Sequence, residues 1–299
     1  MIGQLLANGI ILGATIALGA IGLTMTYNIL DFANFAQGEL LTFGAYFALI
    51  AVSAFAGVHS TFGALSFGWP MVVALLLAAA LTSLLAILVD WLVFRPLRRS
   101  SIQVALVIAS FGASLLLRHL VVLIWGPQPA YYTTNIQIST QILPGVRVTP
   151  DQIFLVALTA LLVVGLHFFL SRTKLGKAMR ATADDPQLAQ VTGIDVARVV
   201  RWTWIVGGSL AAVAGVLYGM TVQILPEMGF NLILPLFAAA ILGGVGSVYG
   251  AVLGGLVIGI AENLSVLFLT PTYKPAIAFL LMIAVLLVRP TGILGKPKL

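Results

Sequence analysis

Five polar residues interrupt long apolar stretches of the chain: Asn34, Gln37, Glu39, Glu262 and Asn263. An ionisable side chain is costly in the hydrocarbon core of a membrane. It therefore usually faces the interior of a helical bundle or a water-filled path, where it can contact a solute or relay a proton. Glu39 and Glu262 are thus candidates for a translocation pathway, with the three amides as neutral neighbours. Two other interpretations stay open: Glu39 could reach the membrane interface from a nearby helix start, and either glutamate could pair with another buried group.

Enzyme chemistry has no comparable set of residues. The chain has no cysteine, which excludes thiol catalysis and cysteine metal sites. Its three histidines are scattered, without carboxylates at ligand spacing, so we predict no metal site. A phosphate-binding G-x-x-x-x-G-K-[ST] loop is also absent from the sequence, since Gly176 and Lys177 are followed by Ala178, which offers no hydroxyl for magnesium. We expect neither an enzyme nor a cofactor in this chain.

The composition explains where the five polar residues must lie. The chain has 299 residues, of which 61% are hydrophobic and 8% are charged, whereas roughly a quarter of the residues in an average soluble domain are charged. Lipid cannot pair exposed backbone groups, so spanning segments must be helices or closed barrels, and the unbroken apolar runs favour helices. The sequence therefore predicts an all-α, polytopic membrane bundle of about 8–10 transmembrane helices, forming a single domain over residues 1–299.

Nine spans are predicted from the apolar runs, at about 20 residues per crossing. They lie near residues 4–28, 38–57, 69–94, 102–125, 151–170, 200–224, 232–248, 249–269 and 274–288. The N-terminal stretch lacks a basic region and a cleavage pattern, so it counts as a span and not as a signal peptide. The seventh span is short, contains Pro235 and closes on glycines, which makes it a candidate half-helix.

The positive charges predict the orientation, because Lys and Arg in short connections stay on the cytoplasmic side. With these spans, the opposite face holds only Arg147 and Lys274, and Arg118 falls inside a span. The richer face collects Arg95, Arg98, Arg99, Arg172, Lys174, Lys177, Arg180, Arg198, Arg201, Arg289, Lys296 and Lys298. We therefore expect the N-terminus outside and the C-terminus in the cytoplasm. Residues 126–150 would then form a short extended outer cap, and residues 171–199 would be cytoplasmic.

Small residues recur at helical spacing in two of the spans. Gly207, Ala211, Gly215 and Gly219 line one face of the sixth span, as Gly9, Gly13 and Ala17 do in the first. Small residues at every fourth position let helices approach closely in a membrane, which predicts helix packing. The alternative is that these faces slide as a pathway opens.

Two glycine-containing breaks resemble each other, and they have the sequences LDFANFAQGELLTFGAY and ILGGVGSVYGAVLGG. In transporters such breaks can mark discontinuous helices near the midplane and an internal repeat. Ordinary cytoplasmic turns would explain them as well.

The cytoplasmic segment has more structure than a linker needs. Asp184 or Asp185 can cap a helix whose first residue is Pro186, because a carboxylate accepts from the free amides and proline already has a helical φ. The helix would run to Thr192 and end at Gly193 in the C′ position. The sequence thus predicts a short, rigid element between two spans.

The stretch from Ala178 to Gly193 resembles the loop by which ABC-transporter permeases engage their ATPases. Gly193 stands at the glycine of that pattern. The usual Glu-Ala-Ala triplet is replaced by Gln187, Leu188 and Ala189.

Longer blocks resemble the branched-chain amino acid ABC permeases, in the order of that family. They are ANGIILGATIALGAIGLTMTYNILDFANFAQGELLTFGAY, RTKLGKAMRATADDPQLAQVTGIDVARV, GGSLAAVAGVLYG and AAAILGGVGSVYGAVLGGLVIG. Together they cover about a third of the chain. One departure is Gln37, which occupies a position where the family pattern has histidine.

The resemblance implies a permease subunit of a binding-protein-dependent importer in the inner membrane. A second, related permease would complete the pathway. Two cytoplasmic subunits would bind ATP and Mg and dock on the segment 171–199, through Asp184, Asp185, Pro186, Gln187, Leu188, Ala189 and Gly193. A solute-binding protein would deliver substrate outside. The resemblance points to leucine, isoleucine, valine or other neutral amino acids.

Two alternatives remain at this stage. A urea or short-chain amide permease would have a closely similar sequence. An ion-coupled secondary transporter, with Glu39 or Glu262 carrying a proton, would leave the capped cytoplasmic helix unexplained.

Overall fold

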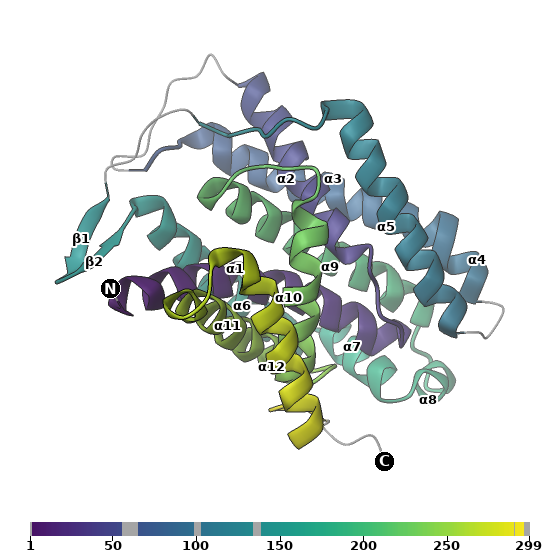
Figure 1. The fold of residues 1–299 in the computed structure, drawn as a ribbon. Helices are drawn as coiled ribbons and strands as arrows, with labels where there is room; N and C mark the ends of the chain where they lie inside the picture. Colours follow the sequence, from purple (N-terminus) through teal and green to yellow (C-terminus); the bar gives the residue numbers. More distant parts are fainter. Residues whose placement is uncertain (1, 56–64, 99–102, 134–138, 290, 296–299) are drawn as a thin grey trace.

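The computed structural model describes residues 2–55, 65–98, 103–133, 139–289 and 291–295, and this part of the chain is mostly helical (Figure 1). Eight of its helices are long and apolar enough to cross a membrane, which confirms the predicted all-α polytopic bundle. They are α1 (Ile2–Leu30), α2 (Gln37–Ala54), α3 (Trp69–Val89) with its continuation through a π-helical turn (Asp90–Phe94) into α4 (Arg95–Leu97), α5 (Gln103–Trp125), α6 (Pro150–Arg172), α9 (Val196–Thr221), α11 (Val248–Leu264) with the 3-10 turn after it, and α12 (Lys274–Val288) with the turn before it.

The seventh predicted span, near residues 232–248, needs correction. The structure has a shorter helix there, α10 (Met228–Gly243), which begins earlier and ends earlier than predicted. It ends because Gly244 and Gly246 have φ of 103° and 91°, a conformation that a side chain disfavours. The residues after Gly243 therefore form a tight turn into α11, and α10 is a helix of 16 residues with Pro235 inside it.

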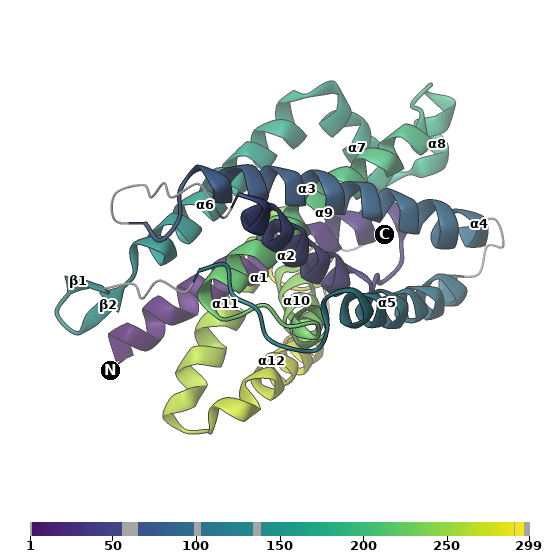
Figure 2. The ribbon, with the colours of Figure 1, turned by 90° about the horizontal axis from the view of Figure 1, so that it is seen from above.

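Helix α1 is the centre of the bundle, with α11, α9 and α10 packed around it (Figures 1 and 2). It meets α11 antiparallel, with Gly9 beside Ile260 and Gly13 beside Gly255 and Leu256. A Cβ atom built on Gly13 would come within 2.9 Å of the backbone of α11. Small residues here thus bring two backbones into contact, which is how helices associate in lipid.

The face of α9 that carries the fourfold small-residue spacing is also packed. Gly207 lies against Gly22 of α1, and a Cβ on Gly215 would overlap the carbonyl oxygen of Leu41 in α2. Ala211 is fully buried, and Gly219 lies against Tyr132. Each of the four predicted packing positions of this span therefore lies on a buried or contacting surface.

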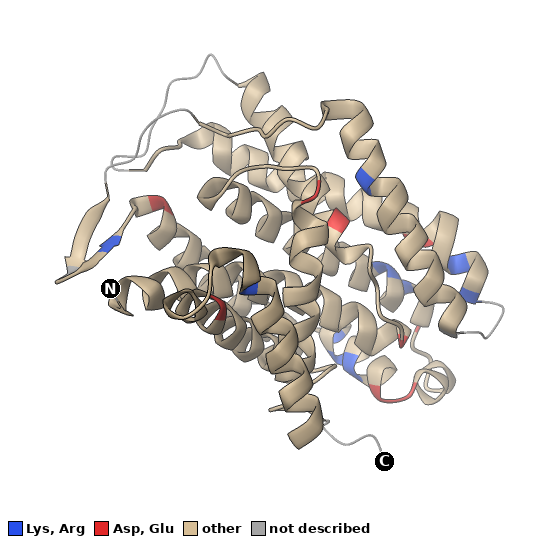
Figure 3. Ribbon diagram, viewed as in Figure 1, with Lys and Arg blue, Asp and Glu red and all other residues tan. Residues whose placement is uncertain are grey.

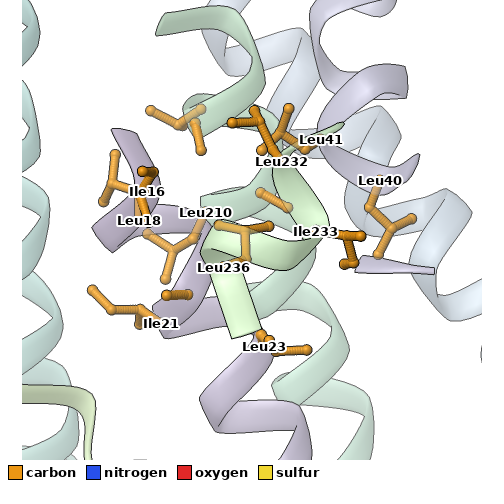
Figure 4. Close-up of a cluster of buried hydrophobic side chains, with 14 of the residues drawn as sticks. Ile16, Leu18, Ile21, Leu23, Leu40, Leu41, Leu210, Leu232, Ile233 and Leu236 are labelled. Atoms are coloured by element: carbon orange, nitrogen blue, oxygen red, sulfur yellow. The ribbon is translucent and has the colours of Figure 1, made fainter. Parts of the chain in front are cut away.

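Aliphatic side chains fill the place where α1, α2, α9 and α10 cross (Figure 4). Leu18 and Ile21 of α1, Leu41 of α2 and Leu236 of α10 are inaccessible to solvent. Around them lie Ile16, Leu23, Leu40, Leu210, Leu232 and Ile233. This part of the apolar core thus joins these four helices.

The first of the two glycine-containing breaks is a re-entrant segment. Gln37, the first residue of α2, lies beside Gly22 of α1, because a Cβ on Gly22 would come within 2.5 Å of its Nε2. Gly22 is about two turns before α1 ends at Leu30, roughly 12 Å along the helix. Residues 31–36 therefore turn back into the bundle, and α2 begins in its interior.

The second break is different, although its sequence looks similar. Gly243 and Gly250 face each other across the α10–α11 turn, and Gly246 lies against Asn28 near the end of α1. This connection is a tight turn at the end of the bundle. The first break therefore leads into a helix that begins inside the bundle, whereas the second is an end turn, so the two breaks are not equivalent.

The two ends of the bundle carry different elements. The N-terminus and the hairpin of β1 (Thr140–Leu143) and β2 (Val146–Val148) lie at one end, and the C-terminus, α7 (Lys174–Asp184) and α8 (Pro186–Val191) lie at the other (Figure 1). The hairpin belongs to the predicted extended cap. Most of the Lys and Arg residues gather around α4, α7 and α8 (Figure 3). Arg99, Lys296 and Lys298 lie outside the described residues.

Candidate functional site

A polar stripe runs along α5, formed by Ser110, Ser114 and Arg118 at every fourth residue. Ser110 is buried against the re-entrant segment, where its Oγ accepts from Phe35 N at 3.1 Å and lies 3.2 Å from Ala33 O. One turn further, the Ser114 Oγ donates to Glu39 Oε1 at 3.4 Å. The next turn places Arg118 Nη2 at 3.1 Å from Glu227 Oε2. The stripe therefore connects α5 to the start of α2 and to the start of α10.

Glu39 is the most enclosed ionisable group of this region. It lies in the first turn of α2 and is inaccessible to solvent, and its Oε2 has no hydrogen-bond partner among the described residues. The backbone amides at a helix N-terminus favour a negative charge, which offsets part of the cost of burying the carboxylate. The interpretation that Glu39 reaches the membrane interface is wrong, because α2 begins inside the bundle.

Helix α10 begins beside the start of α2. The Gly229 amide donates to Thr42 Oγ1 at 3.0 Å, and Gly38 and Gly229 are so close that a Cβ on either would overlap the other's carbonyl oxygen. Glu227 is the N-cap residue of α10. The guanidinium of Arg118 lies over the ring of Phe230, 4.8 Å from its centroid. The N-termini of α2 and α10 thus meet at the polar stripe of α5.

Asn34 and Gln37 complete the start of α2. Asn34 Oδ1 accepts from Ala36 N at 3.1 Å, while its Nδ2 has no partner among the described residues. Gln37 Nε2 donates to Gly207 O of α9 at 3.3 Å. Both side chains are buried. The structure therefore brings Asn34, Gln37 and Glu39 together at one place.

Glu262 and Asn263 form a separate group near the other end of the bundle. Asn263 Nδ2 donates to Gly259 O at 3.0 Å, and its Oδ1 accepts from Lys274 Nζ at 3.2 Å. Positions along α1 show how far this group lies from the start of α2. Gly9 lies beside this part of α11, whereas Gly22 lies beside Gln37. These glycines are about three and a half turns apart, roughly 20 Å. The five predicted pathway residues thus belong to two sites.

The connection that follows α5 is tied to α2 and to the segment before α10. Ala130 and Ile224 pair as an isolated β-bridge through two 2.9 Å hydrogen bonds, which ties residues 126–133 to the segment before α10. The Tyr132 hydroxyl donates to Ala45 O, in the middle of α2, at 2.9 Å. Burial raises the pKa of this phenol well above its usual range, so it remains a protonated donor. Residues 126–133 therefore cover the start of α10 from the hairpin side.

The segment between α6 and α9 contains two capped helices. Asp185, not Asp184, caps α8, and its Oδ1 accepts from Gln187 N at 2.8 Å and from Leu188 N at 3.0 Å. Asp184 is the last residue of α7, a helix that the sequence interpretation missed although Thr173 caps it. Gly193 follows α8 with φ of 89°.

The short helix α8 presents two apolar side chains outward. Pro186 is its first residue, and Ala189 is buried beneath it. Leu188 and Val191, one turn apart, are 61% and 85% exposed. They form a small exposed apolar surface on a capped helix at this end of the bundle.

Aromatic rings connect this segment to the re-entrant segment. Helix α9 starts at Val196, directly after the α8 turn, and its Trp204 stacks on Phe94 with ring centroids 5.4 Å apart and planes at 5°. Phe94 in turn lies 5.0 Å from Phe32 of the re-entrant segment. All three rings are buried. A continuous packed route thus leads from α8 to the start of α2.

The sequence interpretation missed Ser110, Ser114 and Glu227 as site residues, and it placed Arg118 inside a span. The fourfold spacing of Ser110, Ser114 and Arg118 inside one span was the available signal. No spacing links them to Glu227, because that contact depends on how α10 packs against α2 and α5.

Comparisons with known proteins cover nearly the whole chain. A family model described as branched-chain amino acid transport system / permease component matches residues 5–286. The permease protein BraD of a high-affinity branched-chain amino acid transport system from Pseudomonas aeruginosa is 38% identical over 300 residues, or 99% of this chain and 96% of that protein. LivH of Escherichia coli K12, described in the same words, is 37% identical over 303 residues with the same coverage. A probable branched-chain amino acid transport permease protein LivH from Methanocaldococcus jannaschii is 32% identical over 309 residues, or 98% and 92%.

Proposed function

Because the chain belongs to the family of permease components of branched-chain amino acid transport systems, we propose that it conducts leucine, isoleucine, valine or closely similar neutral amino acids through the cytoplasmic membrane. The substrate class follows from the names of relatives that cover almost the whole chain. A urea or amide permease is not favoured by these names.

In the proposed assembly, this chain pairs with a second and related permease. Two cytoplasmic subunits bind and hydrolyse ATP with Mg, and an extracytoplasmic binding protein delivers the solute. The N-terminus and the β1–β2 hairpin face outward, while α7, α8 and the C-terminus are cytoplasmic. The gathering of Lys and Arg around α4, α7 and α8 supports this orientation, since cationic connections stay inside.

One observation carries the proposal that α8 is the docking element: the exposed pair Leu188 and Val191 on a helix that is fixed at both ends. Apolar side chains that protrude from a rigid element bind a partner with little loss of conformational entropy. The Asp185 cap and the positive φ of Gly193 hold the helix in place. The segment 171–199 would thus transmit force from the ATPase to the membrane helices.

The contacting rings of Trp204, Phe94 and Phe32 supply a route for that force. A shift of α8 moves the start of α9, and the stack passes the displacement to the re-entrant segment. Asn34, Gln37 and Glu39 then lie on the part of the pathway that changes. Glu262 and Asn263 lie near the outer end, where they would meet the entering solute.

The docking proposal can be tested with the double variant L188A/V191A in the complete transporter, reconstituted in liposomes with its binding protein. Uptake of leucine should fall at least about tenfold if this pair is the hot spot of the interface, because truncating a hot-spot residue costs about 2 kcal/mol or more. Gln190→Ala is the matched control, since Gln190 is exposed on the same helix and polar. Unchanged uptake by the double variant, with the protein inserted normally, would contradict the docking role of α8.

The transmission route predicts a different outcome for Trp204→Leu. ATP hydrolysis should persist while leucine uptake falls, because the ATPases still dock on α8 but the displacement no longer reaches the re-entrant segment. The ratio of ATP hydrolysed to leucine transported measures this uncoupling. A proportional loss of both activities would instead indicate damage to the fold.

A further inference from the structure

A buried ion pair lies at the end of the spanning segment that α3 begins and α4 closes. Arg98 Nη2 donates to Asp90 Oδ1, and the two side chains are 24% and 9% exposed. Asp90 directly follows the 21 residues of α3, which extend about 31 Å. Replacing a buried ion pair with well-packed apolar residues is often neutral or even stabilising. Stability alone therefore does not account for two charges in this place.

The pair depends on the π-helical turn that begins at Asp90. The Arg95 amide donates to Asp90 O, five residues back, where an α-helix would use the carbonyl four residues back. Pro96 favours this irregularity, because it has no amide for Leu92 O and its ring crowds that carbonyl. In an α-helix, residues eight positions apart point about 80° apart around the axis. The π turn takes up one extra residue, so Arg98 lies where the seventh residue after Asp90 would lie, about 20° away.

The same turn gives this segment one side that faces α9. Asp90 and Phe94 are buried and Arg98 is half-buried, whereas Arg95 is exposed. The Phe94 ring stacks on Trp204 of α9, and the Trp204 side chain also lies next to the Asp90 carboxylate. The Trp204 Nε1–H makes no hydrogen bond of good geometry within the described residues. The ion pair and the aromatic contact thus share one surface between this segment and α9.

The ion pair discriminates between two helical registers of this segment. A return to a regular α-helix would turn Arg98 by about 100° relative to Asp90, from 20° on one side to 80° on the other. Asp90 would then be left unpaired inside the bundle, which is strongly unfavourable. Phe94, at the end of the π turn, would rotate as well and lose its position on Trp204. The pair therefore penalises the register in which the aromatic contact is broken.

We propose that Asp90 and Arg98 are positioning residues for coupling. Their ion pair holds the π-helical turn in the register that keeps Phe94 on Trp204, so that a displacement of α9 is passed on to the re-entrant segment. This inference rests on the proposed transport function, and it adds the element that keeps the aromatic route connected. Removal of the two charges should weaken coupling while the ATPases still dock on α8.

The test uses the double variant D90N/R98Q in the complete transporter, reconstituted in liposomes with its binding protein. The two amide side chains can still form a hydrogen bond, but the charges that penalise the other register are gone. The number of ATP molecules hydrolysed per leucine transported should therefore rise several-fold. Arg95→Gln is the matched control, because it removes a positive charge from an exposed position next to the same turn and should leave the ratio unchanged. An unchanged ratio in the double variant would overturn the inference.

A second pair of measurements separates positioning from a purely structural role. Arg98→Lys keeps a cation beside Asp90, so its ratio should stay close to that of the unmodified transporter. The midpoint of thermal unfolding in detergent should be similar for D90N/R98Q and the unmodified chain, because exchanging both partners of a buried pair together is close to neutral. A lower midpoint with a proportional loss of hydrolysis and uptake would show that the pair is structural. A ratio as high in Arg98→Lys as in the double variant would show that the charge is not what matters.

The outcomes also separate this inference from the transport function. If the unmodified transporter shows no ATP-dependent leucine uptake, the proposed function fails. If uptake is present and Trp204→Leu uncouples it while D90N/R98Q does not, the aromatic route stands and the positioning role of the ion pair is wrong.

Discussion

The helices at the centre of this protein and those at its edge are built by different rules. In the most apolar window of α9, 72% of the residues are buried within the chain, and in that of α1, 67%. The corresponding shares are 22% for α5, 17% for α6 and 6% for α12. The central helices touch through glycine backbones, whereas the edge helices carry large exposed aliphatic side chains.

The difference shows where specificity comes from in a membrane. Lipid tails are as apolar as leucine, so burying a leucine against another helix gains little there, and close backbone packing decides which helices associate. A glycine therefore helps to decide which helices associate only when the backbone of another helix lies against it. The edge helices, in contrast, are free to meet lipid or other subunits of an assembly.

The largest expected effect is at the central contacts. Gly215→Val would force a side chain into the carbonyl of Leu41, and Gly259→Val would force one into the backbone of Gly13. The helices would have to separate, which costs more than about 3 kcal/mol when no rotamer relieves the overlap. We expect little folded protein, measured as the yield of monodisperse chain in detergent and as the midpoint of thermal unfolding. Normal yield of either variant would show that the central helices tolerate separation.

Most of the fold could be predicted from the sequence, because apolar runs and small-residue spacing are properties of single segments. The helix at 228–243 was harder, since its start depends on the meeting of Gly38 with Gly229 and its end on two glycines of positive φ. Helix α7 was missed because its amphipathic sequence, KLGKAMRATAD, is too polar to count as a span. Tertiary contact sets the start of α10, whereas local glycines set its end.

The site was only partly predictable for the same reason. Asn34, Gln37 and Glu39 are neighbours in sequence, so their grouping followed from the chain itself. Glu262 was grouped with them only because it is also an acidic residue in a span. The structure places it near the C-terminal end of α11, away from the start of α2. The contact between Arg118 and Glu227 joins residues more than a hundred positions apart, so it required the packing of α5 against α10.

A smaller effect is expected at the hydrogen bond between α2 and α10. Thr42→Val keeps the shape of the side chain but removes the acceptor of the Gly229 amide. Hydrogen bonds between membrane helices contribute about 0.6 kcal/mol on average and up to about 1.7 kcal/mol, and the buried amide here would lose its side-chain partner. A lower unfolding midpoint in detergent would report the loss. Ser171→Ala, at an exposed residue near the end of α6, is the control and should change nothing.

The smallest effect, with the opposite sign, is expected at the edge. Gly112 in α5 and Gly165 in α6 have no described atom within 4 Å of the position that a Cβ would occupy. Replacing either with alanine should leave the stability of the purified chain unchanged or raise it by at most about 0.5–1 kcal/mol, because alanine loses less backbone entropy in a helix.

The two sites should then differ in the assembled transporter. If α5 meets another subunit closely, Gly112→Ala will weaken assembly while Gly165→Ala will not, and size-exclusion chromatography of the complex can distinguish them. Equal behaviour of both variants would mean that neither glycine lies under a partner's backbone.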